Sequence, residues 1–250
     1  MNKTIFPLLL PIFLFAQTGL EIAEQVDNRK TPKDMTADLS MVLTNKKGNT
    51  RTSKIHSVTI EGGKKQIIWF LAPADDKGVS FLKIEHNDKD DEMRMWLPAF
   101  KKIRRISAKK KGDSFMGSDM SYEDMSNREL FENTYKRLED EIVEETECYV
   151  IEVVPNPEVK SNYSRHKTWI EKARFIPLKE ESYDRKGKLK KTKTFSYADI
   201  KDYVTPTEIY VEDVQKNHNT RLVFDNIKLD SGIKDNVFHE KNLKRMPRKN

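Results

Sequence analysis

The sequence predicts a mainly β protein in which a curved antiparallel sheet forms a half-open barrel with a few covering helices. From residue 35 onward, apolar and polar residues alternate in about a dozen short segments, which is the period of a half-buried strand. Short turn-rich stretches separate these segments, as in antiparallel hairpins. Helix signals are few, so a large sheet with one apolar face must curl around that face to bury it.

A helix is expected first, over residues 20–28, because Leu20, Ala23 and Val26 fall on one side of it. The first strand follows over residues 35–43, and its apolar face is formed by Met35, Ala37, Leu39, Met41 and Leu43. The same alternation predicts further strands over residues 54–60, 66–71, 79–84, 93–97, 135–143, 149–154, 166–170, 178–183, 189–197, 207–211 and 221–227. A weaker helix signal covers residues 236–243.

Four turn-rich stretches predict β-hairpins, because Gly, Asn and Asp allow the tight backbone turns that hairpins need. They cover residues 45–49, 61–64, 184–187 and 216–219. The second stretch, Glu-Gly-Gly-Lys, lacks the spacing and the Ser or Thr of a phosphate-binding P-loop. Nothing repeats at a fixed period and no long linker divides the chain, so we expect one domain over residues 17–250.

Residues 1–16 fit a cleaved secretory signal peptide. A lysine at position 3 precedes an apolar run over residues 5–15, and Ala16 ends the segment. The run is shorter than the roughly 20 residues of a membrane-spanning helix, and two prolines interrupt it. No later segment is apolar enough to span a bilayer. We therefore expect export to the periplasm without a transmembrane segment in the mature chain.

Cys148 is the only cysteine of this highly charged chain, so no internal disulfide can form. It lies in a strand-like run, where a small buried thiol is ordinary, and a catalytic thiol is not favoured. The formal net charge is +6, but the distribution of charge says more than the sum. Basic residues gather in a few blocks, so charge-based binding has to be considered block by block.

No arrangement of residues predicts catalysis, a cofactor or a metal centre. The five histidines are scattered without the spacing of a zinc site, and Ser118 lacks the flanking glycines of a nucleophile elbow. Asp119, Ser121, Glu123 and Asp124 alternate closely enough to converge on calcium, but the calcium-loop glycine and spacing are missing. We expect instead that these groups bond backbone amides or pair with basic residues, and that the protein is not an enzyme.

The block of residues 101–111 carries many basic residues and no acidic one. Export makes nucleic acid an improbable partner. Anionic lipid headgroups, lipopolysaccharide or an acidic face of a partner protein fit better, with contacts expected at Lys101, Lys102, Arg104 and Arg105. The alternative is a solvated loop or an edge strand whose charges only prevent edge-to-edge pairing.

Several large apolar residues are candidates for binding acyl chains. A large sheet with few helices leaves part of its apolar face exposed or occupied by a ligand, and methionine suits varied apolar ligands. The alternative is that these residues form ordinary core. The candidates are Trp69, Phe81, Met93, Met95, Trp96, Phe115 and Met116.

Short motifs lie between about residues 71 and 124. They are Pro73, Lys-Gly at 77–78, Phe-Leu at 81–82, Met-Trp-Leu-Pro at 95–98, Arg-Arg-Ile at 104–106, Phe-Met-Gly-Ser-Asp at 115–119 and Tyr-Glu-Asp at 122–124. Together they resemble the LolA-like family of outer membrane lipoprotein-sorting proteins. The resemblance implies a half-open antiparallel barrel with helices across its mouth, whose apolar cavity takes acyl chains in the periplasm.

The expected function is therefore that of a periplasmic carrier that binds acyl chains of lipoproteins or other lipids and takes part in lipoprotein sorting or lipid transport. Its expected partners are the lipid cargo, an inner-membrane transporter and an outer-membrane acceptor. The alternative is a non-carrier interaction or sensor module of the envelope, accessory to a hydrophobe exporter of the resistance-nodulation-division type.

Overall fold

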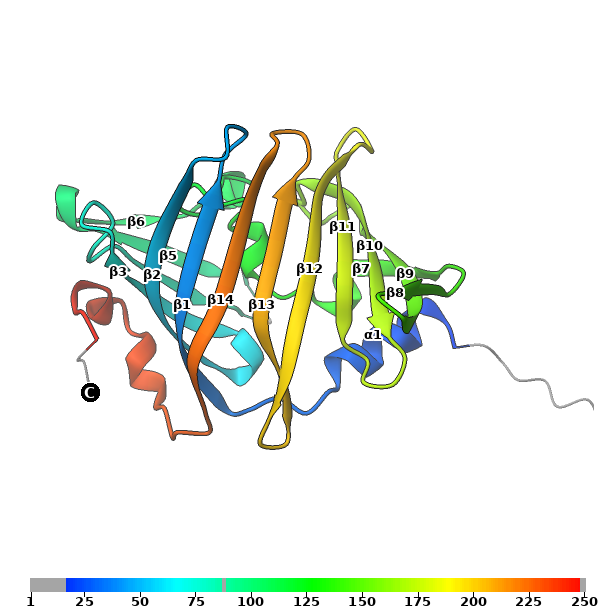
Figure 1. Ribbon diagram of the computed structural model, residues 1–250. Coiled ribbons are helices and arrows are strands. Elements are labelled where there is room, and N and C mark those ends of the chain that lie inside the picture. Colours follow the sequence, from blue (N-terminus) through cyan, green and yellow to red (C-terminus); the bar gives the residue numbers. More distant parts are fainter. Residues whose placement is uncertain (1–16, 87–88, 248–250) are drawn as a thin grey trace, which may run out of the picture.

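A computed structural model of the chain describes residues 17–86 and 89–247, and the expected signal peptide over residues 1–16 lies outside these residues. The described residues form a 14-stranded sheet in which every strand pairing is antiparallel. The sheet is open and curved, and its two ends bend back behind the long central strands (Figure 1). The predicted half-open antiparallel barrel is confirmed.

The strands of the described chain are β1 (Asp34–Thr44), β2 (Thr50–Ile60), β3 (Lys65–Ala72), β4 (Ser80–Ile84), β5 (Glu92–Leu97), β6 (Lys102–Arg105), β7 (Asn133–Arg137), β8 (Glu141–Val143), β9 (Thr146–Pro155), β10 (Tyr163–Glu171), β11 (Pro177–Asp184), β12 (Leu189–Ile200), β13 (Tyr203–Asp213) and β14 (His218–Leu229). The helices are α1 (Gly19–Asp27) and the short 3₁₀ turns η1 (Glu61–Gly63), η2 (Pro98–Phe100), η3 (Ala108–Lys110), η4 (Glu123–Met125), η5 (Leu130–Glu132), η6 (Asp235–Phe238) and η7 (Glu240–Lys244).

The strand order places the first and last strands in the middle of the sheet. It runs β6-β5-β4-β3-β2-β1-β14-β13-β12-β11-β10-β9-β7, and β8 also pairs with β9. Strands β1 and β14 meet at the centre, where Leu39 lies opposite Phe224. The four predicted hairpins are confirmed, because the stretches concerned connect β1 to β2, β2 to β3, β11 to β12 and β13 to β14.

Two predicted elements differ from the observed ones. The single strand expected over residues 135–143 is two strands, because residues 138–140 face only residues 149 and 150 of β9, which leaves one residue too many for a regular ladder. The helix expected over residues 236–243 is instead the pair η6 and η7. Its break falls at His239, whose backbone is extended (φ −79°, ψ 140°).

The C-terminal segment covers the outer face of the sheet at β3 and β4. Phe238 and Leu243 pack there with Trp69 and Leu82 in one buried cluster. Two hydrogen bonds fix the segment: the indole of Trp69 donates to the carbonyl of Asn242 at 3.3 Å, and the Ser80 hydroxyl donates to the carbonyl of Leu243 at 2.6 Å. This part of the sheet is therefore buried on both faces.

Helix α1, predicted over residues 20–28 and observed over Gly19–Asp27, packs on the inner face at the other end of the sheet. Its first residue is Gly19, where a Cβ atom would lie 2.8 Å from the backbone nitrogen of Arg137 in β7. A larger residue would push the helix off this strand. On the outer side of the same region Cys148 is fully buried beside Val150 and Trp169, which confirms the predicted buried thiol.

Candidate ligand chambers inside the half-barrel

The inner face of strands β1 to β5 is filled by the protein itself. The segment 106–125 enters the half-barrel and places Phe115 and Tyr122 against these strands. The Phe115 ring centroid lies 5.2 Å from that of Phe81 and 5.8 Å from that of Tyr122, with both pairs near edge-to-face, an arrangement that favours aromatic pairs. We call segment 106–125 the plug.

Two carboxylates hold the plug inside the half-barrel. Asp119 accepts a hydrogen bond from the Thr220 hydroxyl at 2.7 Å and lies 2.7 Å from Nδ1 of His218. Asp124 lies 2.7 Å from the ammonium groups of Lys191 and Lys193. The expectation that the acidic groups of residues 119–124 pair with polar and basic partners is therefore confirmed.

Asp124 belongs to a buried charge network on the inner face of β11 and β12. Lys193 also bonds Glu180 at 3.1 Å, and Glu180 receives two hydrogen bonds from the Arg128 guanidinium, each 2.7 Å long. Burial alone would raise the pKa of Asp124, but Lys193 and Lys191 outweigh it and hold that pKa well below its ordinary value. Burial would likewise raise the pKa of Glu180, but Arg128 and Lys193 outweigh it and hold that pKa well below its ordinary value.

His166 lies beside this network and is held neutral. Its side chain is 3% exposed, and its Nδ1 lies 2.9 Å from the Ser182 hydroxyl. Burial, followed by the nearby Arg128, lowers the pKa of His166 to about 3. Protonating this ring at mildly acidic pH would place another positive charge among Arg128, Lys191 and Lys193.

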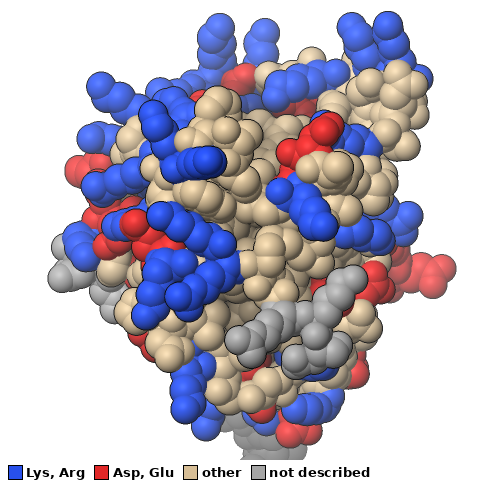
Figure 2. Space-filling model, turned by 90° about the vertical axis from the view of Figure 1, so that its left-hand side faces the viewer, with Lys and Arg blue, Asp and Glu red and all other residues tan. Residues whose placement is uncertain are grey.

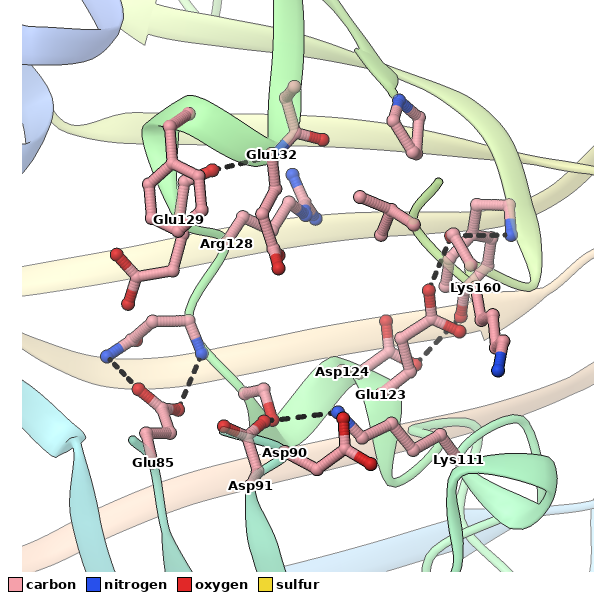
Figure 3. A pocket seen from close by; sticks show the side chains of 18 of the residues that line it. Glu85, Asp90, Asp91, Lys111, Glu123, Asp124, Arg128, Glu129, Glu132 and Lys160 are labelled. Carbon is pink, nitrogen blue, oxygen red and sulfur yellow. Dashed lines mark hydrogen bonds and ion pairs between the residues drawn. The ribbon is translucent and has the colours of Figure 1, made fainter. Parts of the chain in front are cut away.

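One cavity among the described residues of the half-barrel, the polar chamber, has a volume of about 370 Å³. In Figure 3, Arg128 lies on one side of it and Asp91 and Lys111 lie on the other, with Glu123 and Asp124 close to Lys111. Most of its charged groups already have partners: Lys111 bonds Asp91 at 3.1 Å, and Glu123 accepts from the backbone and side-chain amides of Asn162. The chamber suits water or a polar headgroup better than an acyl chain.

The second cavity, the α1 chamber, has a volume of about 510 Å³ and lies beneath helix α1. That volume falls within the roughly 300–1,000 Å³ of typical ligand pockets. Arg128 and Asn127 border both chambers. The apolar side chains that line it are Ala23, Val26, Leu130, Tyr135, Ile151, Val153, Ile170, Pro177 and Phe195.

The inner face becomes apolar toward α1 because of the order of residues along each strand. In β12 the inward positions are Lys191 and Lys193 and then Phe195, which lines the α1 chamber. In β10 they are His166 and then Ile170, which packs against α1. The neighbouring chambers thus offer an apolar wall at one end and hydrogen-bonding groups at the other, which is the division that an amphiphile needs.

The seven residues expected to bind acyl chains do not line either chamber. Phe81, Met93, Met95 and Phe115 are buried in the core between plug and sheet, and Met116 packs against that core. Trp69 and Trp96 lie on the outer face with the C-terminal segment. The split follows from the strand period, because neighbours such as Met95 and Trp96 point to opposite faces.

The residues that line the α1 chamber were not singled out from the sequence. Most of its apolar residues lie in the expected helix 20–28 and in the expected strands 135–143, 149–154, 166–170 and 189–197. Single apolar residues there carry no sign that they line a cavity. The expected headgroup or partner contacts lie elsewhere. Lys101, Lys102, Arg104 and Arg105 are exposed at the edge of the sheet, at the start of β6 and along it.

Comparison with known proteins agrees with this architecture. A family model described as an uncharacterized protein matches residues 62–245, and no curated protein sequence matches significantly. An outer membrane lipoprotein-sorting protein domain from Vibrio parahaemolyticus is 33% identical, with a TM-score of 0.85 over 91% of this chain and 98% of that one. A DUF1329 family protein from Desulfovibrio piger is 30% identical, with a TM-score of 0.85 over 90% and 97%.

A third solved structure, a LolA superfamily protein from Nitrosomonas europaea, shares the fold at 19% identity, with a TM-score of 0.72 over 91% of this chain and 100% of that one. The fold is that of a family of lipid or lipoprotein carriers. The chain belongs to the LolA-like family of outer membrane lipoprotein-sorting proteins. Among the described residues, no helix is long and apolar enough to cross a membrane.

Proposed function

We propose that this protein is a periplasmic carrier that shields an acyl chain of a lipoprotein or another lipid inside the α1 chamber. The observation that carries the proposal is the chamber itself, a cavity of about 510 Å³ in a half-barrel of the lipoprotein-sorting family. Nine apolar side chains form one part of its wall, and polar and charged residues such as Arg29, Glu61 and Arg128 form the rest. The signal-peptide pattern of residues 1–16 supports a periplasmic location. No catalytic step is part of the proposal.

Burial of the acyl chain supplies enough free energy for a carrier. Each buried CH₂ group contributes about 0.8 kcal/mol, so about ten such groups give about 8 kcal/mol, which corresponds to a Kd of about 1 μM. That affinity holds a lipid in the water between two membranes and still permits release. Because the plug already fills the inner face of β1 to β5, the acyl chain goes to the part of the half-barrel near α1.

The polar part of the cargo has a defined place in this arrangement. Arg128 borders both chambers and is held in position by its paired hydrogen bonds to Glu180. An acyl chain under α1 would leave its headgroup next to Arg128 and the polar chamber. A single buried chain with a polar end therefore fits better than a wholly apolar ligand.

Binding of cis-parinaric acid, whose fluorescence rises in an apolar site, tests the chamber directly. The variant Val26→Trp places a larger side chain in the chamber wall and is expected to weaken binding at least tenfold. The matched control Val42→Trp makes the same change at a half-buried position on the outer face of β1, away from the chamber. This variant should bind parinaric acid as the native chain does. Equal affinity in the native chain and Val26→Trp would contradict the proposal.

Native mass spectrometry of protein isolated from the periplasm tests the nature of the cargo. The proposal expects a fraction of the molecules to carry one acylated ligand, and that fraction should fall in Val26→Trp. Protein that remains empty, and that does not take up lipid from added lipoprotein or phospholipid, would instead favour the non-carrier interaction module.

A further inference from the structure

One end of the sheet carries an exposed aromatic residue at a hairpin tip. Phe100 lies in η2 between β5 and β6, and 70% of its surface is exposed. The turn is well defined, because Pro98 opens it and Lys101 closes it with a left-handed backbone (φ 48°). An exposed aromatic ring is not by itself evidence of a contact surface, so the residues around Phe100 decide what this tip can bind.

The side chains around Phe100 are basic and lack acidic partners. Within residues 17–86 and 89–247, none of Lys101, Lys102, Arg104 and Arg105 forms an ion pair. Basic residues nearby in the sequence do: Arg94 pairs with Glu92 and Glu240, and Lys111 pairs with Asp91. Figure 2 faces this end of the molecule, and Lys and Arg side chains gather there.

These charges project from both faces of the edge strand β6. Arg104 lies opposite Met95, whose side chain belongs to the inner core, and Ile103 lies opposite Trp96, which packs on the outer face. Because successive side chains alternate, Lys102 and Arg104 lie toward the inner side and Arg105 toward the outer side. Phe100 lies beyond the end of the strand, in the turn η2.

We propose that this tip, Phe100 with Lys101, Lys102, Arg104 and Arg105, docks the protein on an anionic lipid surface. A broad charged surface engages cations on both faces of the strand at once, while the aromatic ring enters the headgroup region, where aromatic side chains are favoured. A peptide added along β6 would use the strand's backbone and leave Phe100 without a contact. The proposal concerns a surface remote from the α1 chamber and does not rest on cargo binding.

Vesicle sedimentation measures the charge contribution. The native chain is expected to bind vesicles of phosphatidylcholine with 30% phosphatidylglycerol at low salt, and to bind phosphatidylcholine alone at least tenfold more weakly. Each basic residue near an anionic surface contributes about fivefold in affinity, so the double variant Arg104→Gln, Arg105→Gln should lose about 25-fold. The matched control Lys46→Gln, Lys47→Gln removes two exposed lysines from the β1–β2 turn and should have little effect.

A second variant pair tests the aromatic tip. Phe100→Ser should weaken binding about tenfold, because its ring no longer leaves water. The control Ile142→Ser removes a side chain that is 72% exposed in β8, near the other edge of the sheet, and should not change binding. In Phe100→Trp, brominated lipids should quench the added fluorescence.

An unchanged midpoint of urea unfolding in every variant confirms that the chain is folded, and this control does not depend on ligand binding in the α1 chamber. Three results would overturn the proposal. They are no binding of the native chain to anionic vesicles, equal binding by the Arg104/Arg105 variant and the native chain, and capture of poly-glutamate without vesicle binding. The last result would assign the tip to an acidic protein segment instead.

Discussion

The two halves of the sheet differ in what occupies their inner faces. Strands β1 to β5 face the plug, whose aromatic rings complete an apolar core. Strands β9 to β12 face a buried charge network and two chambers. Both halves have the same alternating strand pattern, so alternation defines which face is inward but not whether protein, water or ligand fills the space.

The difference has a physical origin in the inward residues. The first half presents mainly apolar side chains to the plug. Lys83 is the charged exception, and it donates to the carbonyl of Met125 at 2.7 Å and pairs with Glu85. The second half presents Lys191, Lys193 and Glu180, which must keep charged partners when buried. Three charged side chains therefore lie together on the inner face of β11 and β12, and space remains between this network and helix α1.

The largest expected effect comes from removing the carboxylate that joins the two halves. Asp124→Ala leaves Lys191 and Lys193 without their shared partner, so the free energy of unfolding should fall by about 3–5 kcal/mol. Urea denaturation measures the loss. Asp113→Ala changes an exposed carboxylate of the same plug and should cost less than about 0.5 kcal/mol. Similar stabilities of the two variants would show that the network does not hold the plug.

A pair of Phe→Ala substitutions compares the filled half with the open half. Phe115→Ala empties space in a closed core and should cost about 3 kcal/mol. Phe195→Ala, in the wall of the α1 chamber, removes a half-exposed ring and should cost about 1 kcal/mol. Equal losses in urea denaturation would mean that both halves are packed alike. Only Phe195→Ala should weaken parinaric acid binding.

Acid should destabilise the open half through His166. Its folded pKa is about 3 and its unfolded pKa is about 6.5, so the unfolded chain binds more protons between these values and stability falls as pH falls. Between pH 6.5 and 5 the loss should be about 2 kcal/mol. Below about pH 4.5 the lowered pKa values of Asp124 and Glu180 add a further loss of the same sign.

The variant His166→Gln isolates the histidine contribution, because glutamine does not titrate. Its free energy of unfolding should change little between pH 6.5 and 5. The control His239→Gln, at an exposed site, should lose as much free energy of unfolding over this pH range as the native chain does. If the free energy of unfolding of His166→Gln still fell steeply with falling pH, the pH dependence would belong to other groups.

The smallest expected effect concerns the cover of the α1 chamber. The Thr18 hydroxyl accepts from the backbone of Glu21 at 3.2 Å, and the Glu21 carboxylate accepts from the backbone of Thr18 at 2.7 Å. Thr18→Ala removes half of this capping box and should destabilise α1 by about 1 kcal/mol, with faster amide exchange in the helix. Ser107→Ala is the control, since Ser107 precedes η3 without a side-chain cap.

Local patterns predicted the fold well because strands, hairpin turns and the first helix depend on neighbouring residues. The site could not be predicted in the same way, because it depends on which half the plug fills. Met93 and Phe115 are residues of the kind that line an apolar ligand site, yet both belong to one buried core cluster. Asp124 and Lys193 are 69 residues apart in the sequence, and no local sequence pattern predicts that they form a pair.

The basic tip at β6 could be predicted in part from the sequence. The block of residues 101–111 suggested a contact surface or a protected edge strand, and β6 does lie at the edge of the sheet. That Phe100 lies exposed beside these basic residues follows from the conformation of the turn η2, which the sequence did not predict. Charge could be predicted from composition, while the shape of the tip required the three-dimensional structure.

The central claim is that acyl chains bind in the α1 chamber and not in the core beneath the plug. A crystal structure with a fatty acid brominated at its methyl end tests this directly, because bromine gives an unambiguous anomalous signal. The account predicts a peak beside Ile151, Ile170 and Phe195, with the carboxylate toward Arg128. A peak among Phe81, Met95 and Phe115 with the plug displaced, or density confined to the outer surface, would contradict it.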